Sequence, residues 1–290
     1  MISSESFNEP IEVGMMHAKL YGSILMLRLY LSFGLLGFAT NTSAADSVMD
    51  ILKPYYPLYN EALGCHGAIA PSGSVNGLTR EAYMTGYCID IDRQKVIETD
   101  KGKRLYIVMK GNASFNEDGE ALEYTDTRFD SGLVGMFVLK PKGEGWQVES
   151  ANPYMNAGSN GLGLSGWDLE QFATNTWGFI NEHGDTHQGY YSDSLVILTP
   201  SGSGITQSWI GINFNNENAG KCEDDMSECD NTKTTFTIDS HKTVNGFYPL
   251  EITLNGFVKG KKYHNATYRI NYQKNKGYIE PNEYPLKDNY

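Results

Sequence analysis

The chain has 290 residues, of which 35 are acidic and 23 are basic, and its formal net charge is −12 at pH 7. A surplus of negative charge repels phosphate backbones, and the sequence has no basic run interleaved with aromatic residues, so no nucleic acid is expected as a partner. Hydrophobic residues make up 40% of the chain and 19 residues are tyrosine, which argues against a disordered protein. The length suits one large domain or two smaller ones.

The N-terminal region has the features of an export signal. The stretch MLRLYLSFGLLGFATNTSAADS begins at residue 26 with one arginine, continues with an apolar segment and ends in small residues. It predicts a secretory signal peptide over residues 26–45, cleaved near Ala44 or Ala45. The apolar core of about 11 residues is shorter than the roughly 20 residues that cross a bilayer, so we expect no permanent membrane anchor.

Residues 1–25 fit this signal poorly, because the first 14 residues carry three glutamates and no basic residue. We expect translation to begin at Met15, Met16 or Met26, with residues 1–25 as an upstream or extended signal region. Removing 45 of the 290 residues leaves 245. We expect these residues, 46–290, to form a single β-rich domain that is periplasmic or secreted.

Four cysteines lie in this domain: Cys65, Cys88, Cys222 and Cys229. An even number of cysteines in an exported protein predicts disulfides, and four cysteines allow three pairings. Proximity in sequence favours pairing Cys65 with Cys88 and Cys222 with Cys229. A zinc site is the alternative, but neither spacing supplies a close pair such as C-x-x-C.

Most of the domain has the sequence patterns of strands. Continuous apolar runs predict central strands that are covered on both faces, and they lie at residues 104–109, 132–139 and 194–198. Alternating apolar and polar residues predict an antiparallel sheet with one wet face, and they lie at residues 233–239, 247–258 and 263–272. Glycine, asparagine and aspartate cluster between the central runs, as they do in turns.

Helix is expected to be scarce. The best candidates are residues 46–52, with Ser47 as the N-cap, and one or two turns within residues 167–173. The predicted fold class is therefore mainly β: an antiparallel sandwich or barrel-like domain, braced by disulfides, with a short irregular or helical N-terminal segment.

The glycine-rich stretch at residues 156–167 is interpreted as a surface loop, because apolar runs flank it on both sides. Part of it, GLGLSG, matches the dinucleotide-binding motif G-x-G-x-x-G. The stretch lacks the preceding buried strand and the long following helix that this motif needs. We therefore expect no dinucleotide cofactor.

Two histidines and an aspartate at two-residue spacing form the clearest candidate site. On a strand, His183, Asp185 and His187 would share one face and could bind a divalent metal with help from elsewhere in the fold. The glycines, asparagine and aspartate of NEHGDTHQG instead favour a polar connection within a hairpin, where the three side chains need not converge. The connection is the expected structure, and the metal site is the alternative. No other cofactor is predicted.

Two weaker features concern ligands. The segment CEDDMSECD at residues 222–230 could hold calcium, but it lacks the spacing of a calcium loop and is expected to be a solvated hairpin tip. Tryptophans can stack on sugars, although burial in a β core explains them equally simply, and there are four: Trp146, Trp167, Trp177 and Trp209.

No complete catalytic motif is found. The expected function is therefore a non-enzymatic binding or structural module for an envelope polysaccharide or protein, whose recognition residues lie in loops. The alternative is a metal-dependent hydrolase in which His183, Asp185 and His187 hold the metal and a metal-bound water attacks the substrate.

Overall fold

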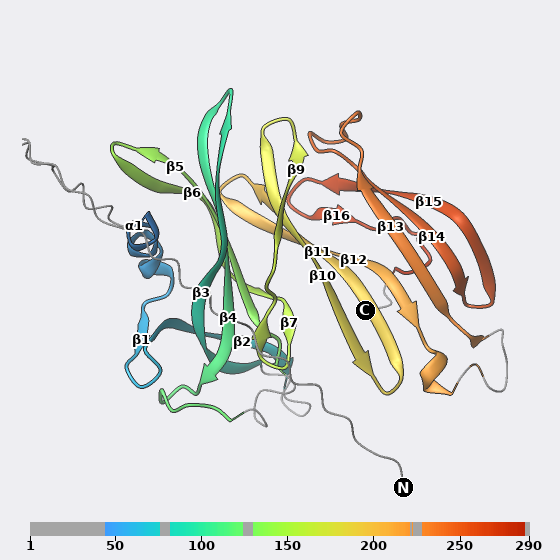
Figure 1. Cartoon of the computed structure of the whole chain (residues 1–290), viewed down its shortest axis with the longest axis horizontal. Coiled ribbons are helices and arrows are strands. Elements are labelled where there is room, and N and C mark those ends of the chain that lie inside the picture. The colour runs from blue at the N-terminus through green and yellow to red at the C-terminus, as the bar shows by residue number, and fades with distance from the viewer. Residues whose placement is uncertain (1–43, 76–81, 124–129, 221, 223–227, 288–290) are drawn as a thin grey trace, which may run out of the picture. The chain divides into compact units, whose positions relative to one another are not determined.

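The computed structural model describes residues 44–75, 82–123, 130–220, 222 and 228–287 (Figure 1). The chain divides into two units, Met1–Asn41 and Thr42–Tyr290, and every described element belongs to the second unit. The predicted translation starts and the signal peptide, apart from its last two residues, lie outside the described residues. Among the described residues, no helix is long and apolar enough to cross a membrane.

The described unit consists almost entirely of antiparallel strands, which confirms the predicted fold class. Strands that are consecutive in sequence pair side by side in a six-stranded sheet and an eight-stranded sheet. The six-stranded sheet contains β1 (Leu58–Asn60), β2 (Cys65–Val75), β3 (Ala82–Thr99), β4 (Gly102–Phe115), β5 (Leu133–Lys142) and β6 (Gly145–Asn156). The eight-stranded sheet contains β9 (Asp168–Ala173), β10 (Thr176–His187), β11 (Tyr190–Ser201), β12 (Gly204–Asn215), β13 (Asn231–Ile238), β14 (Leu250–Val258), β15 (Lys261–Gln273) and β16 (Gly277–Ile279).

A helix covers one face of the six-stranded sheet. Helix α1 (Ala44–Leu52) buries Val48 and Leu52 against that face, and a short 3-10 turn, η1 (Lys53–Tyr55), follows it. The predicted helix is therefore confirmed, but it begins at Ala44, so Ser47 is not its N-cap.

The continuous apolar runs form central strands, as predicted. In β4, Leu105, Ile107 and Met109 pack on the side of α1, whereas Tyr106 and Val108 point the other way. Because successive side chains of a strand alternate between faces, a run without polar residues buries both faces. Tyr106 and Val108 meet side chains of the eight-stranded sheet, so the two sheets share a core.

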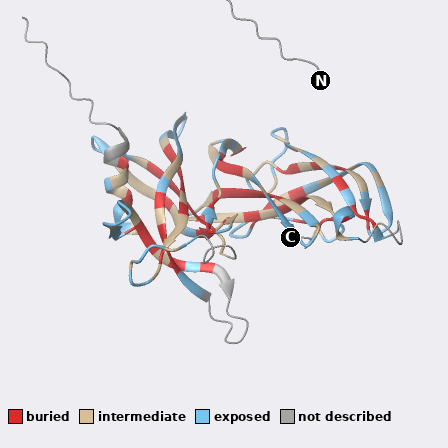
Figure 2. Cartoon of the chain, turned by 60° about the horizontal axis from the view of Figure 1, so that its bottom comes forward, coloured by how far each residue is buried: buried red, intermediate tan, exposed pale blue. Residues whose placement is uncertain are grey.

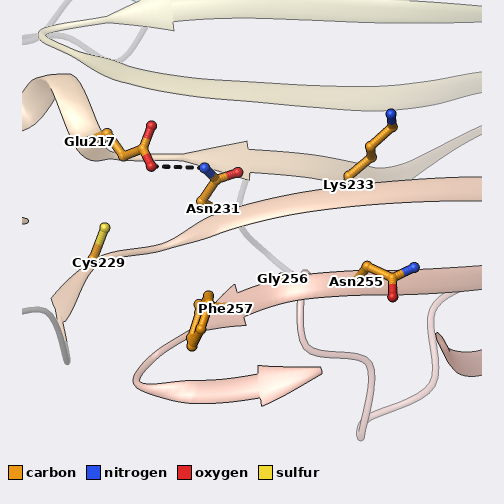
Figure 3. Close-up of a pocket in the computed structure, with 7 residues that line it drawn as sticks. All are labelled: Glu217, Cys229, Asn231, Lys233, Asn255, Gly256 and Phe257. Atoms are coloured by element: carbon orange, nitrogen blue, oxygen red, sulfur yellow. Dashed lines mark hydrogen bonds between the residues drawn. The ribbon is translucent and has the colours of Figure 1, made fainter. Parts of the chain in front are cut away.

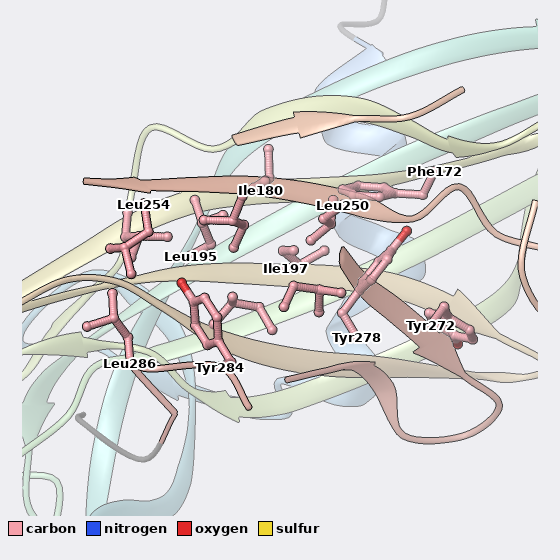
Figure 4. Close-up of a cluster of buried hydrophobic side chains, with 14 of the residues drawn as sticks. Phe172, Ile180, Leu195, Ile197, Leu250, Leu254, Tyr272, Tyr278, Tyr284 and Leu286 are labelled. Carbon is pink, nitrogen blue, oxygen red and sulfur yellow. The ribbon is translucent and has the colours of Figure 1, made fainter. Parts of the chain in front are cut away.

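The eight-stranded sheet also encloses a core of its own. Strands β12 and β13 pair only between Asn215 and Asn231, and beyond this point the two halves of the sheet separate. The alternating segments in β13, β14 and β15 are confirmed as strands with a wet face. Their apolar face packs onto β9–β12, and Figure 4 shows this cluster with Tyr284 and Leu286 of the C-terminal segment. In Figure 2 the buried positions follow the strands of both sheets.

Two sequence interpretations were wrong. Residues 168–173 form strand β9 rather than helical turns, because they pair with β10 and place Leu169 and Phe172 in two different cores. A segment this short gains more from pairing than from an isolated helical turn.

The glycine-rich stretch is not a surface loop, since Ala157 and Trp167 are buried. It contains two short paired strands, β7 (Gly158–Ser159) and β8 (Leu162–Gly163). The N–H of Gly163 donates to Oδ1 of Asn112 at 3.0 Å, and a Cβ on Gly163 would lie 2.7 Å from the backbone N of Gly111. Glycine is needed there because the two backbones approach so closely.

Both predicted disulfides are confirmed: Cys65 pairs with Cys88, and Cys222 pairs with Cys229. The first joins β2 to β3, and the second closes a short loop before β13.

Candidate ligand-binding cavities

The histidine segment lies on a strand rather than in a loop. Strand β10 continues to His187, and only Gln188 and Gly189 separate it from Tyr190 of β11. Both turn residues have positive φ, at 50° and 84°, as a type I′ hairpin requires. The hairpin itself was predicted, but the connection is two residues long, and residues 181–187 pair with β11 throughout.

His183, Asp185 and His187 therefore share one face of β10, but they form a row along the strand. A strand rises about 3.3 Å per residue, so the Cα atoms of His183 and His187 lie about 13 Å apart along it. Ligands of one zinc ion must each come within about 2 Å of the metal. Within the described residues there is no group of three or more histidine, cysteine, aspartate or glutamate side chains placed to hold a metal ion.

Two members of this row line a cavity of about 390 Å³ on the sheet surface, which we call the Trp209 cavity. It is formed by His183 and Asp185 of β10, Ser192 and Ser194 of β11, and Trp209 of β12. The register explains why they meet, since Ser194 pairs directly with His183, and Ser192 with Asp185. The rings of His183 and Trp209 lie 5.6 Å apart, edge to face at 80°.

The electrostatics of this cavity favour a neutral imidazole. Burial lowers the pKa of His183, and the carboxylates of Asp185 and Asp193 oppose this shift. Asp193 faces the other side of the sheet, where it accepts a hydrogen bond from Asn213 at 3.1 Å. Asp193 also raises the pKa of Tyr191 to about 12 through a hydrogen bond. Among the described residues that line the cavity, Asp185 is then the one charged side chain at neutral pH.

The polar atoms of the Trp209 cavity are not linked as a catalytic relay. Among the described residues, no hydrogen bond joins His183 to Asp185, Ser192 or Ser194. A serine nucleophile needs a hydrogen bond to the histidine that activates it in the reactive state. The indole N–H of Trp209 likewise has no acceptor among the described residues. It is thus free to donate to a ligand.

A second cavity, of about 430 Å³, lies elsewhere on the same sheet, and we call it the Phe257 cavity. Its lining comes from η2 (Glu217–Ala219), from β13 and β14, and from the disulfide-bonded Cys229 shortly before β13. The lining residues are Glu217, Cys229, Asn231, Lys233, Asn255, Gly256 and Phe257 (Figure 3). Asn231 pairs with Phe257, and Lys233 pairs with Asn255. These four residues are therefore two neighbouring cross-strand pairs on the wet face of the sheet.

Hydrogen bonds within the Phe257 cavity fix which polar atoms remain for a ligand. Nδ2 of Asn231 donates to Oε1 of Glu217 at 2.8 Å, and Nδ2 of Asn215 donates to Oε2 of Glu217 at 3.2 Å. These two bonds lower the pKa of Glu217. Oδ1 of Asn255 accepts from the N–H of Asn265 at 2.9 Å. Oδ1 of Asn231 and Nδ2 of Asn255 are therefore left as an acceptor and a donor.

The other three tryptophans and the described part of the acidic segment belong to the packing of the fold. Trp167 is fully buried and donates to the backbone O of Leu164 at 2.8 Å, while Trp146 and Trp177 pack against core clusters. Of the acidic segment, Glu223, Asp224 and Asp225 lie outside the described residues. Asp230 is buried and accepts from the N–H of Lys259 at 2.6 Å, which makes it a structural carboxylate.

Sequence reasoning grouped His183 and Asp185 with His187 and singled out Trp209 separately, so it did not join Trp209 to the histidine segment, and it missed the Phe257 cavity. The available signal was the place of Phe257 at a polar position of the alternating segment that forms β14. Comparison with protein-family models, curated protein sequences and solved structures finds no match to this chain.

Proposed function

We propose that this protein is an exported, non-enzymatic binding module for an envelope polysaccharide, and that the Trp209 cavity holds a neutral sugar unit. The observation that carries the proposal is the position of Trp209. Its ring forms one wall of an open cavity, beside a carboxylate and two hydroxyl groups on the neighbouring strands. Aromatic rings present an apolar face that suits the C–H face of a sugar, while the polar groups fix its orientation.

The hydrogen-bonding groups of the cavity suit sugar hydroxyls. Asp185 accepts, the hydroxyls of Ser192 and Ser194 both donate and accept, and the neutral imidazole of His183 has one donor and one acceptor. The two disulfides support export, because disulfides persist in oxidising compartments.

A binding experiment on the mature chain, residues 46–290, tests the proposal. Neutral and N-acetylated hexose oligosaccharides and purified envelope polysaccharide are titrated into wild type and into Trp209→Ala, Asp185→Asn and Glu170→Gln. The first two variants should weaken binding by about tenfold or more, which corresponds to about 1.4 kcal/mol. Glu170 is exposed on β9 outside the cavity, so its variant should bind like wild type. Absence of binding by wild type, or full binding by Trp209→Ala, would contradict the proposal.

The second candidate function is a metal-dependent hydrolase using His183, Asp185 and His187. The observation that favours it is their shared face on β10, where neighbours two residues apart can chelate one ion. The hydrolase alternative predicts close to one divalent metal ion per purified chain. Each of the single variants His183→Ala and His187→Ala should lose this metal. The row geometry disfavours it, because the two histidines lie too far apart to hold the same ion directly. Retained metal in both variants would remove these residues from that role.

A further inference from the structure

We infer that the Phe257 cavity is a second saccharide site, distinct from the Trp209 cavity, and that it takes a sugar that carries a carboxylate, such as a uronic acid unit. The inference does not depend on the Trp209 cavity, since the two cavities share no lining residue.

The apolar part of the site is the ring of Phe257. This side chain is 44% exposed at the end of β14, where it pairs with Asn231 on one side and Lys262 on the other. Nζ of Lys262 lies 5.7 Å from the ring centroid. An exposed phenyl ring with polar neighbours offers a flat apolar surface, and the C–H face of a pyranose ring matches such a surface.

The neutral polar part of the site is directional. Oδ1 of Asn231 can accept a hydrogen bond from a sugar hydroxyl, because its amide nitrogen is committed to Glu217. Nδ2 of Asn255 can donate to a sugar oxygen, because its amide oxygen is committed to Asn265. Each amide is thereby held in one orientation, which lowers the cost of ordering it when a ligand binds.

The charge of the site selects for an anion. Lys233 lines the cavity, and its ammonium has no ion-pair partner among the described residues, although the chain carries 12 more negative than positive charges. The amides of Asn231 and Asn215 hold the Glu217 carboxylate in its charged form. The anion is favoured because two ammonium groups, Lys233 and Lys262 beside Phe257, stand against this one carboxylate. A ligand carboxylate beside Lys233 can pair with its ammonium, and a charge-assisted hydrogen bond is stronger than a neutral one. Inorganic phosphate has the charge but no apolar face for Phe257.

The test uses the mature, oxidised chain and three probes: a galacturonic acid tetramer, a neutral galactose tetramer and a tetraglutamate peptide. Calorimetry on Trp209→Ala, which removes neutral-sugar binding at the Trp209 cavity, should show binding of the galacturonic acid tetramer at least tenfold tighter than either other probe, and weaker binding as salt rises. Equal binding of the neutral tetramer or tighter binding of the peptide would overturn the inference, as would no binding of the uronate.

Variants assign the binding to this cavity. Lys233→Met keeps the aliphatic stem and should weaken uronate binding about tenfold, and Phe257→Ala should weaken it at least as much. Lys276→Met removes an exposed lysine outside the cavity and should bind like wild type. Because Lys233 and Phe257 are exposed, both variants should fold, and thermal unfolding verifies this. Unchanged uronate binding in folded Lys233→Met and Phe257→Ala would overturn the inference.

The two proposals fail separately. Trp209→Ala should leave uronate binding unchanged. If Trp209→Ala abolishes binding of both the uronate and the neutral probes, the Trp209 cavity is the sole site and the inference made here is wrong. If only the neutral probes fail to bind wild type, the proposed function of the Trp209 cavity is wrong, while the Phe257 site stands.

Discussion

The Trp209 cavity and the Phe257 cavity lie on the same eight-stranded sheet and have similar volumes, about 390 and about 430 Å³. Each has an aromatic wall on a strand and polar side chains from the strand beside it. They differ in charge, since Asp185 is the charged group among the described lining residues of the first, whereas the second holds Glu217 and Lys233, an ammonium with no ion-pair partner among the described residues. Size and aromatic character therefore do not distinguish their ligands, whereas the charged residue does.

Removal of each disulfide in turn should give the largest change in stability and should affect the two cavities differently. Loss of Cys65–Cys88 (both cysteines to serine) should lower the free energy of unfolding by about 3 kcal/mol, and loss of Cys222–Cys229 by about 2 kcal/mol, because the first closes a longer loop. Only the second contributes to the Phe257 cavity, through Cys229. Urea unfolding measures stability, and uronate titration should be weakened by the second pair of substitutions alone. Equal loss of uronate binding in both would contradict the assignment.

Gly256→Ala should disturb the Phe257 cavity without affecting the Trp209 cavity. Gly256 has φ +117°, and an added Cβ would lie 2.0 Å from the backbone O of Asn231, so the variant should lose about 1–3 kcal/mol of stability. In Gly246→Ala, the matched control, φ is +86° and no heavy atom lies within 4 Å of the added Cβ. The control should lose stability from the backbone conformation alone and should keep both affinities, as measured by the two titrations.

Tyr284→Phe should lower stability while sparing both cavities. The hydroxyl of buried Tyr284 donates to the backbone O of Gly211 on β12, and its loss should cost about 1 kcal/mol. Neither residue is among the lining residues of the Trp209 cavity or the Phe257 cavity. Urea unfolding should report the loss, while both titrations stay at wild-type values. A drop in either affinity would show that binding depends on global stability rather than on the lining residues.

The smallest expected effect is a pH dependence of stability from His183. Its pKa is lowered in the folded protein by burial, so the unfolded chain binds the proton more readily. The stabilisation is therefore complete above the unfolded value of about 6.5 and is lost as the pH falls below it. His183→Gln should flatten this part of the curve of unfolding free energy against pH. A steeper curve for His183→Gln would contradict the assigned direction.

The fold was predictable because its signals are local. Apolar runs in β4, β5 and β11 and alternation in β13–β15 are visible within each segment. Two cysteine pairs close in sequence likewise identified both disulfides. The β10–β11 hairpin was predicted, but its two-residue turn was not, because Gln188 is not a residue type that predicts positive φ.

The cavities were not predictable, because they depend on strand register. His183 and Trp209 meet only through the pairing of β10, β11 and β12, and Asn231 meets Phe257 only through the pairing of β13 and β14. A shift of one residue in either pairing would turn these side chains to the opposite face. The sequence shows which strands alternate, but it does not show which residues stand opposite each other.

The most direct test of the central claim is a fluorescence titration of the mature chain with neutral hexose oligosaccharides and purified envelope polysaccharide, comparing wild type with Trp209→Phe. Trp209 is the tryptophan that lines the proposed sugar site, while Trp167 is buried in the core. We predict a saturable change in tryptophan emission for wild type that is absent in Trp209→Phe. An unchanged response in Trp209→Phe, or no response in wild type to any of these probes, would contradict the account.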